Sequence, residues 1–103
     1  MEEQDLNLGQ VVCSLAGRDK GHLFLVIEKV DVRHVIISDG KYRKVDKGKK
    51  KKVKHLKKTN YIVYELQKSL EEHKTISDAQ IRRYLKDYQQ SLQGTYLNEE
   101  WGN

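Results

Sequence analysis

Two apolar segments joined by a glycine-containing loop constrain the fold of this chain more than any other feature. Residues 11–15 and 23–30 are rich in Val, Leu and Ile, which favour β-strands, and the second is the longest apolar run in the sequence. The loop at 16–22 carries a glycine on each side of an Arg-Asp-Lys sequence. Glycine permits the positive φ and the close backbone approach that a tight loop against a phosphate requires. Residues 9–28 therefore predict two strands, the longer of them central, joined by a loop suited to an anion.

Further strands and turns follow directly. Residues 35–37 predict a third strand, and Asp39-Gly40 is typical of a tight hairpin turn. A fourth strand is expected at 42–45, and a fifth at 53–56, where an edge strand would turn its lysines to solvent. Several short strands separated by turns predict a small barrel and a mostly β fold.

Helical periodicity replaces this pattern after residue 59. Asn60 is expected to cap a first helix that runs to about Glu72 and carries Ile62, Leu66 and Leu70 at intervals of four. A short linker at 73–75 then predicts a helical hairpin.

The second helix has clearer signals. Ser77 is a good N-cap with Gln80 as its capping-box partner, and Ile76 is placed to pack on Ile81. An apolar face follows, made of Ile81, Tyr84, Leu85, Tyr88 and Leu92. This face either docks on the barrel or presents Tyr84, Tyr88 and Leu92 to a protein partner. In the second case, Arg82, Arg83 and Lys86 would flank the surface. The chain thus divides into a barrel at 7–58, a helical appendage at 60–92 and a mobile tail at 93–103.

Positive charge is concentrated in one part of the chain. The net charge is +5, yet residues 41–58 contain 11 Lys and Arg against Asp46 alone, which gives +10 locally and −5 for the remainder. Unpaired lysines are costly to bury, so this strip is expected to be solvated. It either serves solubility or binds an anionic partner, and its position between folded segments favours binding.

Other classes of protein fit the sequence poorly. Cys13 is the only cysteine, which excludes an internal disulfide and fits a reducing compartment. Neither a signal peptide nor a membrane span is evident, so we expect a cytoplasmic protein without a membrane partner. The four histidines are scattered, and no Walker or dinucleotide motif occurs. We therefore expect no enzyme, no cofactor and no metal site.

The glycine loop and its flanks resemble the KOW motif of ribosomal proteins and transcription elongation factors. The resemblance rests on Gly9-x-Val11-Val12, Ala16-Gly17-x-Asp19-Lys20-Gly21, Val26 and Val35-Ile36-Ile37-Ser38-Asp39-Gly40. It is nearest to KOW-type large-subunit ribosomal proteins of archaea and eukaryotes. The lysine-rich continuation is similar to small bacterial KOW-domain RNA-binding proteins. Residues 7–59 are covered, with one departure: Phe24 stands where many KOW motifs have a third glycine.

The resemblance implies an SH3-like barrel that binds RNA through the loop and the adjoining basic residues. From the loop, Arg18, Lys20 and His22 would face RNA. Tyr42 would either stack on a base or pack on the barrel. The electrostatic footprint consists of the basic residues of the strip: Lys41, Arg43, Lys44, Lys47, Lys49, Lys50, Lys51, Lys52, Lys54, Lys57 and Lys58.

Function follows as an expectation with one alternative. The first hypothesis is a monomeric, non-enzymatic RNA-binding protein that associates with ribosomal RNA, with ribosomal proteins as further partners. Lysine outnumbers arginine in the strip, which favours backbone contact over reading of base edges. The alternative is a protein-interaction adaptor, for example on RNA polymerase or the translation machinery, with only weak RNA tethering.

Overall fold

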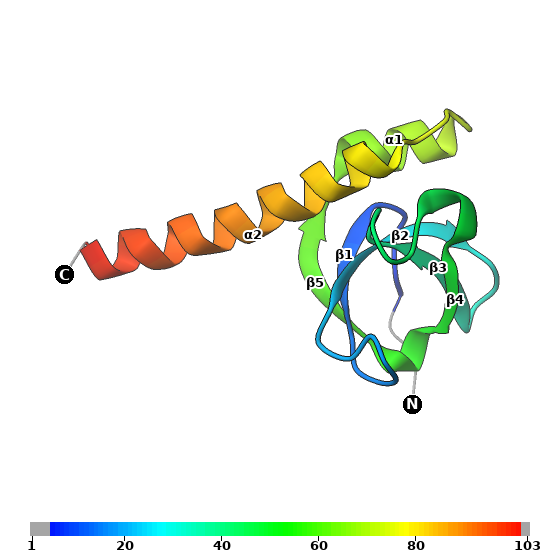
Figure 1. Cartoon of the computed structure of the whole chain (residues 1–103), viewed down its shortest axis with the longest axis horizontal. Coiled ribbons are helices and arrows are strands. Elements are labelled where there is room, and N and C mark those ends of the chain that lie inside the picture. The colour runs from blue at the N-terminus through cyan, green and yellow to red at the C-terminus, as the bar shows by residue number, and fades with distance from the viewer. Residues whose placement is uncertain (1–4, 102–103) are drawn as a thin grey trace.

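Five antiparallel strands form one curved sheet, and two α-helices pack against its outer face (Figure 1). The computed structural model describes the backbone of residues 5–101 and the side chains of residues 5–92. The strands are β1 (Gln10–Ser14), β2 (Leu23–Lys29), β3 (His34–Ser38), β4 (Lys49–Lys52) and β5 (Leu56–Ile62). They lie in the order β4-β3-β2-β1-β5, so the prediction that the longest apolar run is a central strand is confirmed.

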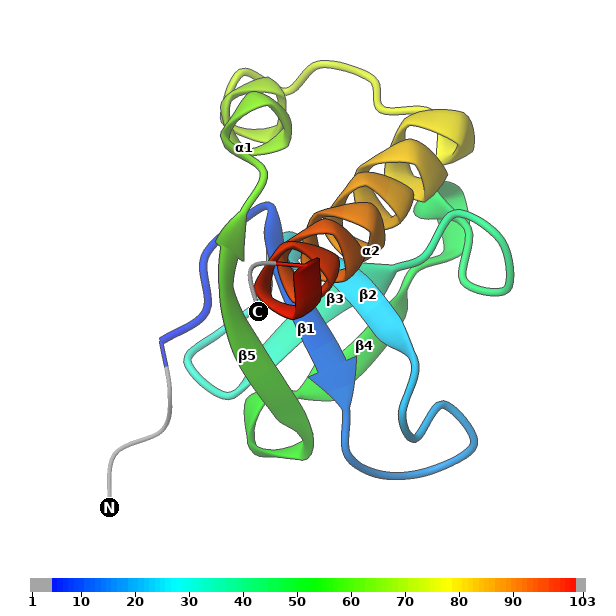
Figure 2. The ribbon, with the colours of Figure 1, turned by 90° about the vertical axis from the view of Figure 1, so that its left-hand side faces the viewer.

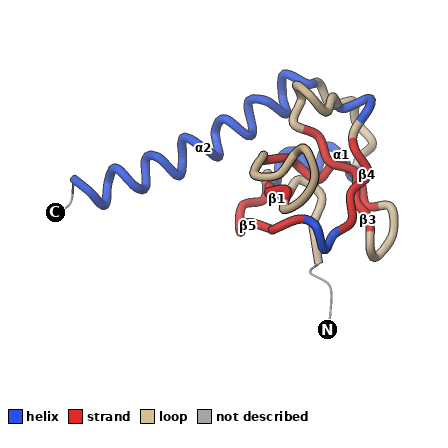
Figure 3. Tube along the Cα trace, turned by 60° about the horizontal axis from the view of Figure 1, so that its bottom comes forward, coloured by secondary structure: helices blue, strands red, loops and turns tan. Residues whose placement is uncertain are grey.

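The two edges of the sheet are β4 and β5, which are consecutive in the chain. A single 3-10 turn, η2 (Val53–His55), joins them (Figure 3). Within residues 5–101 the two edges do not pair, so the sheet is not a closed barrel. Helix and strand shares are about equal, and the expectation of a mostly β fold is therefore wrong for the chain as a whole.

Strands β1 and β2 are buried on both faces, because successive side chains point to opposite sides of a strand. Val12, Phe24 and Val26 belong to a core inside the curve of the sheet. Val11 and Leu25 belong to a second core between the outer face and the helices. Phe24, which stands where many KOW motifs have a glycine, is 1% exposed and belongs to this inner core.

Helices α1 (Tyr64–Glu71) and α2 (Asp78–Trp101) run in opposite directions beside the sheet (Figures 1 and 2). The predicted capping box is confirmed: Ser77 Oγ accepts the N–H of Gln80 at 3.1 Å, and Gln80 Oε1 accepts the N–H of Ser77 at 3.0 Å. Ile81, Tyr84 and Leu85 are buried with Val11 and Leu25 of the sheet. The apolar face thus docks on the sheet over its first two turns.

The first helix begins later than the sequence indicates, and the prediction of Asn60 as its N-cap is wrong. Residues 60–62 belong instead to β5, which pairs with β1. Gln10, buried at the start of β1, donates from Nε2 to the carbonyl of Thr59 at 2.8 Å, and Thr59 Oγ1 donates to the carbonyl of Val11. These tertiary contacts override the local helical spacing, and the sheet extends past the boundary expected at residue 58.

The second helix ends later than the sequence indicates. It continues to Trp101, whereas an irregular segment was expected from residue 93. Gly94 costs an α-helix only about 1 kcal/mol relative to alanine, so it does not end one by itself. Residues 1–4, and residues 102–103 of the expected tail, lie outside the described residues.

The segment after β3 differs most from the prediction. Residues 42–45 do not form the expected fourth strand, because Asp39 Oδ1 accepts the N–H groups of Lys41, Tyr42 and Arg43 at 2.8–2.9 Å. A 3-10 turn, η1 (Val45–Lys47), follows, and the chain returns only at β4. The predicted edge strand at 53–56 is likewise wrong, since it falls mainly on η2.

Gly40 in the loop after β3 provides a test of how α2 is seated. Its φ is +73°, and an added Cβ would lie 2.5 Å from the carbonyl oxygen of Asp78. Gly21 has a similar φ of +86°, but open space surrounds its Cβ position. We expect Gly21→Ala to cost about 1 kcal/mol from backbone strain, and Gly40→Ala to cost roughly 1–3 kcal/mol more from overpacking. Urea denaturation measures both, and equal losses would contradict this seating of α2.

Candidate nucleic-acid interface

Asp19 in the loop between β1 and β2 is the centre of a partly buried cluster of charges. Its Oδ2 lies 3.1 Å from Nη2 of Arg43 and 3.6 Å from Nζ of Lys49. The Asp19 side chain is only 11% exposed, and those of Arg43 and Lys49 are about one-third exposed. The cluster therefore joins the glycine loop to β4 and to the segment that precedes it.

The surroundings of Asp19 favour its charged form. Burial opposes ionisation of the carboxyl group, but the hydrogen bond and charge of Arg43 and the charges of Lys49 and Lys51 outweigh it. The pKa of Asp19 is therefore lowered from its ordinary value. The carboxylate is a fixed counter-charge for three of the basic residues predicted to bind RNA.

Strand β4 separates its four lysines by the alternation of side chains. Lys49 and Lys51 pair with Ile37 and Val35 of β3, both of which face the inner core. Lys51 is 8% exposed, and its Nζ donates to the carbonyl of Ala16 in the glycine loop at 3.0 Å. Lys50 and Lys52 are exposed on the opposite face. The structure therefore gives Lys51 an internal partner, which the sequence did not indicate.

The other predicted site residues are exposed on the molecular surface. Lys50 and Lys52 lie on β4, with Lys54 on η2 directly after them. The N–H of Leu15 donates to the carbonyl of His55 at 2.8 Å, which holds the start of the glycine loop beside η2. Basic side chains on successive elements thus come together at this end of the sheet. The full exposed set is Arg18, Lys20, His22, Lys41, Tyr42, Lys44, Lys47, Lys50, Lys52, Lys54, Lys57 and Lys58.

A cationic depression lies at one end of β3 and β4. Its volume is about 370 Å³, and Arg33, His34, Lys52 and Lys54 line it. His34 Nδ1 lies 2.9 Å from Oδ1 of Asp31. Hydrogen bonds from the His34 side chain and from the N–H of Arg33 lower the pKa of Asp31. Arg33 and His34 were not among the predicted site residues, because they stand outside the lysine strip.

Tyr42 is placed for contact with a ligand and does not pack on the sheet. It is 69% exposed, at the turn that Asp39 organises, and Nζ of Lys41 lies 5.1 Å from the centre of its ring. Of the two alternatives left by the sequence, packing on the barrel is therefore wrong. The exposed ring agrees with the stacking alternative.

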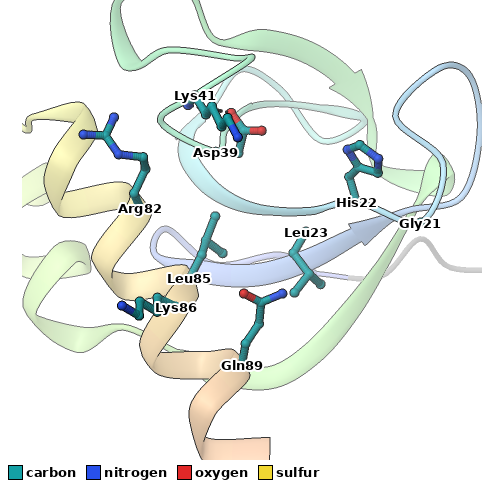
Figure 4. Close-up of a pocket in the computed structure, with 9 residues that line it drawn as sticks. All are labelled: Gly21, His22, Leu23, Asp39, Lys41, Arg82, Leu85, Lys86 and Gln89. Carbon is teal, nitrogen blue, oxygen red and sulfur yellow. Dashed lines mark hydrogen bonds between the residues drawn. The ribbon is translucent and has the colours of Figure 1, made fainter.

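The second helix adds basic residues that were not predicted as part of the interface. A cleft lies between α2 and the loops after β1 and β3 (Figure 4). Arg82, Lys86 and Gln89 line it from the helix, opposite His22 and Lys41. The i, i+4 spacing of Arg82 and Lys86 places them on one side of the helix, and this was the available sequence signal.

The part of the chain that the structure describes bears on two further features, a metal site and a membrane span. There, His, Cys, Asp and Glu side chains form no group of three or more that could hold a metal ion. In the same residues, no helix is both long and apolar enough to cross a membrane.

Asp19→Asn tests the cluster through the pH dependence of stability. The variant is expected to lower the free energy of unfolding at pH 7 by roughly 1–3 kcal/mol, because three cations lose their counter-charge. Because folding lowers the pKa of Asp19, its carboxylate stabilises the folded state at pH values above the ordinary pKa of 3.8. This contribution is lost as the pH falls through the folded-state pKa. The difference between wild type and variant should therefore shrink below about pH 4. Asp46→Asn, at an exposed position, is the control, and a pH-independent difference would contradict the assignment.

Lys50 and Lys51 provide a matched pair within β4. Lys51→Gln is expected to lower the free energy of unfolding by roughly 1–2 kcal/mol, because the buried Lys51 side chain donates from Nζ to the carbonyl of Ala16. Lys50→Gln should change it by no more than about 0.5 kcal/mol, as is usual at the surface. Chemical denaturation of both variants measures the difference. Equal stabilities would show that the alternation of β4 is assigned wrongly.

Comparison with known proteins adds no assignment to this geometry. The sequence matches no protein-family model and no curated protein. A functional conclusion therefore rests on the residues themselves: the Asp19 cluster, the exposed lysines around β4 and η2, and the cleft beside α2.

Proposed function

We propose that this chain is a non-enzymatic RNA-binding protein of the KOW type that associates with ribosomal RNA in the cytoplasm. The observation that carries the proposal is the group of exposed lysines on β4, η2 and β5, held next to the glycine loop. Five short antiparallel strands around a core also agree with an SH3-like barrel that lacks pairing between its edges. Ribosomal proteins are further proposed partners, and the protein acts as a monomer.

The exposed lysines support contact with phosphates more than reading of bases. Lysine is a compact point charge, and RNA presents a regular array of phosphates. The deep and narrow major groove of an RNA helix also hides base edges from side chains. We infer that the lysines of β4 and η2 bind the backbone of structured RNA. Arg18 and Tyr42 are the residues able to stack on exposed bases.

The Asp19 cluster makes the glycine loop part of this interface. It holds the loop across to β4, so that Arg18 and Lys20 lie beside the lysine surface and not on a free arm. Its own cations, Arg43, Lys49 and Lys51, are engaged inside the protein. We assign them a structural role, and we assign phosphate binding to the exposed lysines.

An adaptor function is the second candidate, and exposed aromatic residues favour it. Tyr64, the first residue of α1, is 69% exposed, and Leu92 of α2 is 52% exposed. Tyr61 packs edge-on against Tyr88 with ring centres 5.1 Å apart. Aromatic side chains are enriched in protein interfaces. Tyr84, in contrast, is buried against the sheet and cannot belong to such a surface.

Salt dependence of RNA binding tests the first candidate. If about five phosphates are neutralised, log affinity should fall with log salt at a slope of about −3.5 to −4.5. Replacing Lys50, Lys52 and Lys54 with Gln should weaken binding and make the slope shallower by about 2. The measurement is fluorescence anisotropy of a structured ribosomal RNA fragment across a salt series.

The matched control removes the same charge elsewhere. Lys29, Lys68 and Lys74 are exposed residues of β2, α1 and the linker, and their replacement by Gln should leave the slope near that of wild type. Equal effects of the two triple variants would mean that net charge alone matters. Co-sedimentation with ribosomal subunits, with and without RNase, then tests the ribosomal assignment. Recovery of one protein partner and no ribosomal fraction would favour the adaptor.

A further inference from the structure

The cleft between α2 and the two loops is distinct from the lysine surface of β4 and η2. It has a volume of about 420 Å³. The loop after β1 contributes His22, and the loop after β3 contributes Lys41. The cleft is therefore assembled from three segments that are far apart in the sequence (Figure 4).

The lining combines an apolar floor with a cationic rim. Leu85 and Gln89 reach from α2 toward Leu23 of β2 (Figure 4). Arg82 and Lys86 line the same cleft from the helix. An apolar surface bordered by positive charge and one amide is complementary to an amphipathic anion, in which a flat ring system carries a phosphate.

The cations of the rim keep their capacity to bind an anion. The acidic residue of the lining, Asp39, already accepts three N–H groups of its own loop. Arg82 donates from Nη1 to the carbonyl of Gly40 at 2.7 Å, which leaves its other donors for a ligand. Within residues 5–92 no carboxylate forms an ion pair with Lys86 or Lys41. The phosphate of a ligand would thus bind to cations that are already in place at the rim.

We propose that this cleft binds a single unpaired nucleotide. The base lies on Leu23 and Leu85, with the amide of Gln89 at its edge, and the phosphate lies among Lys41, Arg82 and Lys86. The volume is within the range of about 300–1,000 Å³ that is usual for small-ligand sites. The inference rests on the proposed function in one respect: it names RNA as the main source of the nucleotide. A free mononucleotide has the same chemistry.

A charge-neutral variant tests whether binding depends on the cleft or only on the positive charge of the protein. Gln89→Trp fills the cleft without changing net charge, and Gln90→Trp places the same side chain one position further along α2, at an exposed site. The probes are an RNA hairpin with a one-nucleotide bulge and the same hairpin without the bulge. Wild type should bind the bulged hairpin roughly ten-fold more tightly, as is typical of one stacked base.

The expected result is specific to one variant and one probe. Gln89→Trp should remove the preference for the bulged hairpin while leaving affinity for the bulge-free hairpin unchanged. Gln90→Trp should keep the preference, and thermal melting checks that both variants fold. If both variants keep the preference, if both lose it, or if wild type binds the two hairpins equally, the cleft does not hold an unpaired nucleotide of RNA.

Titration with a free mononucleotide, followed by NMR, distinguishes the two sources. In wild type, the methyl groups of Leu23 and Leu85 and the side-chain amide of Gln89 should shift. If the methyl shifts disappear in Gln89→Trp, the result supports the cleft even when neither hairpin binds. In that outcome the proposed RNA-binding function fails and the nucleotide site stands. Binding of both hairpins without preference, together with no methyl shifts, would overturn the site and leave the proposed function intact.

Discussion

The ion cluster around Asp19 is the interaction on which the arrangement of the basic residues depends. Strands β1 and β4 are not neighbours in the sheet, so no strand pairing holds the glycine loop against β4. Asp19 supplies that connection through Arg43 and Lys49, and Lys51 reinforces it by donating to Ala16. A carboxylate that is 11% exposed is costly to bury alone, and the three cations make its burial possible. The loop is therefore fixed by charges that composition alone would assign to solvent.

The lysines of β4 lie in two different environments, because successive side chains of a β-strand point to opposite faces of the sheet. In β4, Lys49 and Lys51 turn inward and Lys50 and Lys52 turn outward. The inward lysines lie at the rim of the inner core, where each has a polar partner. Lys49 forms an ion pair with Asp19, and Lys51 donates to the carbonyl of Ala16. The outward lysines are exposed to solvent. A run of identical residues thus divides into positions with internal partners and positions exposed to solvent, without any difference in sequence.

Local signals predicted the elements whose stability is local. The capping box at Ser77 and the apolar run of β2 are examples, since each depends on neighbours in the chain. Asp39-Gly40 predicted a tight hairpin with a returning strand at 42–45. That strand does not form, because the Asp39 side chain accepts hydrogen bonds from the N–H groups that the strand would have used. Residues 49–52 have no apolar alternation, so only pairing with β3 and the Asp19 cluster makes them a strand. In the same way, nothing in the sequence places Arg82 opposite His22.

The loop after β3 links the Asp19 cluster to the cleft. Arg43 at its end forms an ion pair with Asp19. At its start, the carbonyl of Gly40 accepts a hydrogen bond from Arg82, and α2 lies too close to Gly40 to leave room for a Cβ. The glycine loop reaches the cleft from the other side, where the N–H of His22 donates to the carbonyl of Asp19 at 2.9 Å. Salt screens exposed charges far more than buried ones. The partly buried Asp19 cluster should therefore keep the loop and the cleft in place at ionic strengths that screen the exposed lysines.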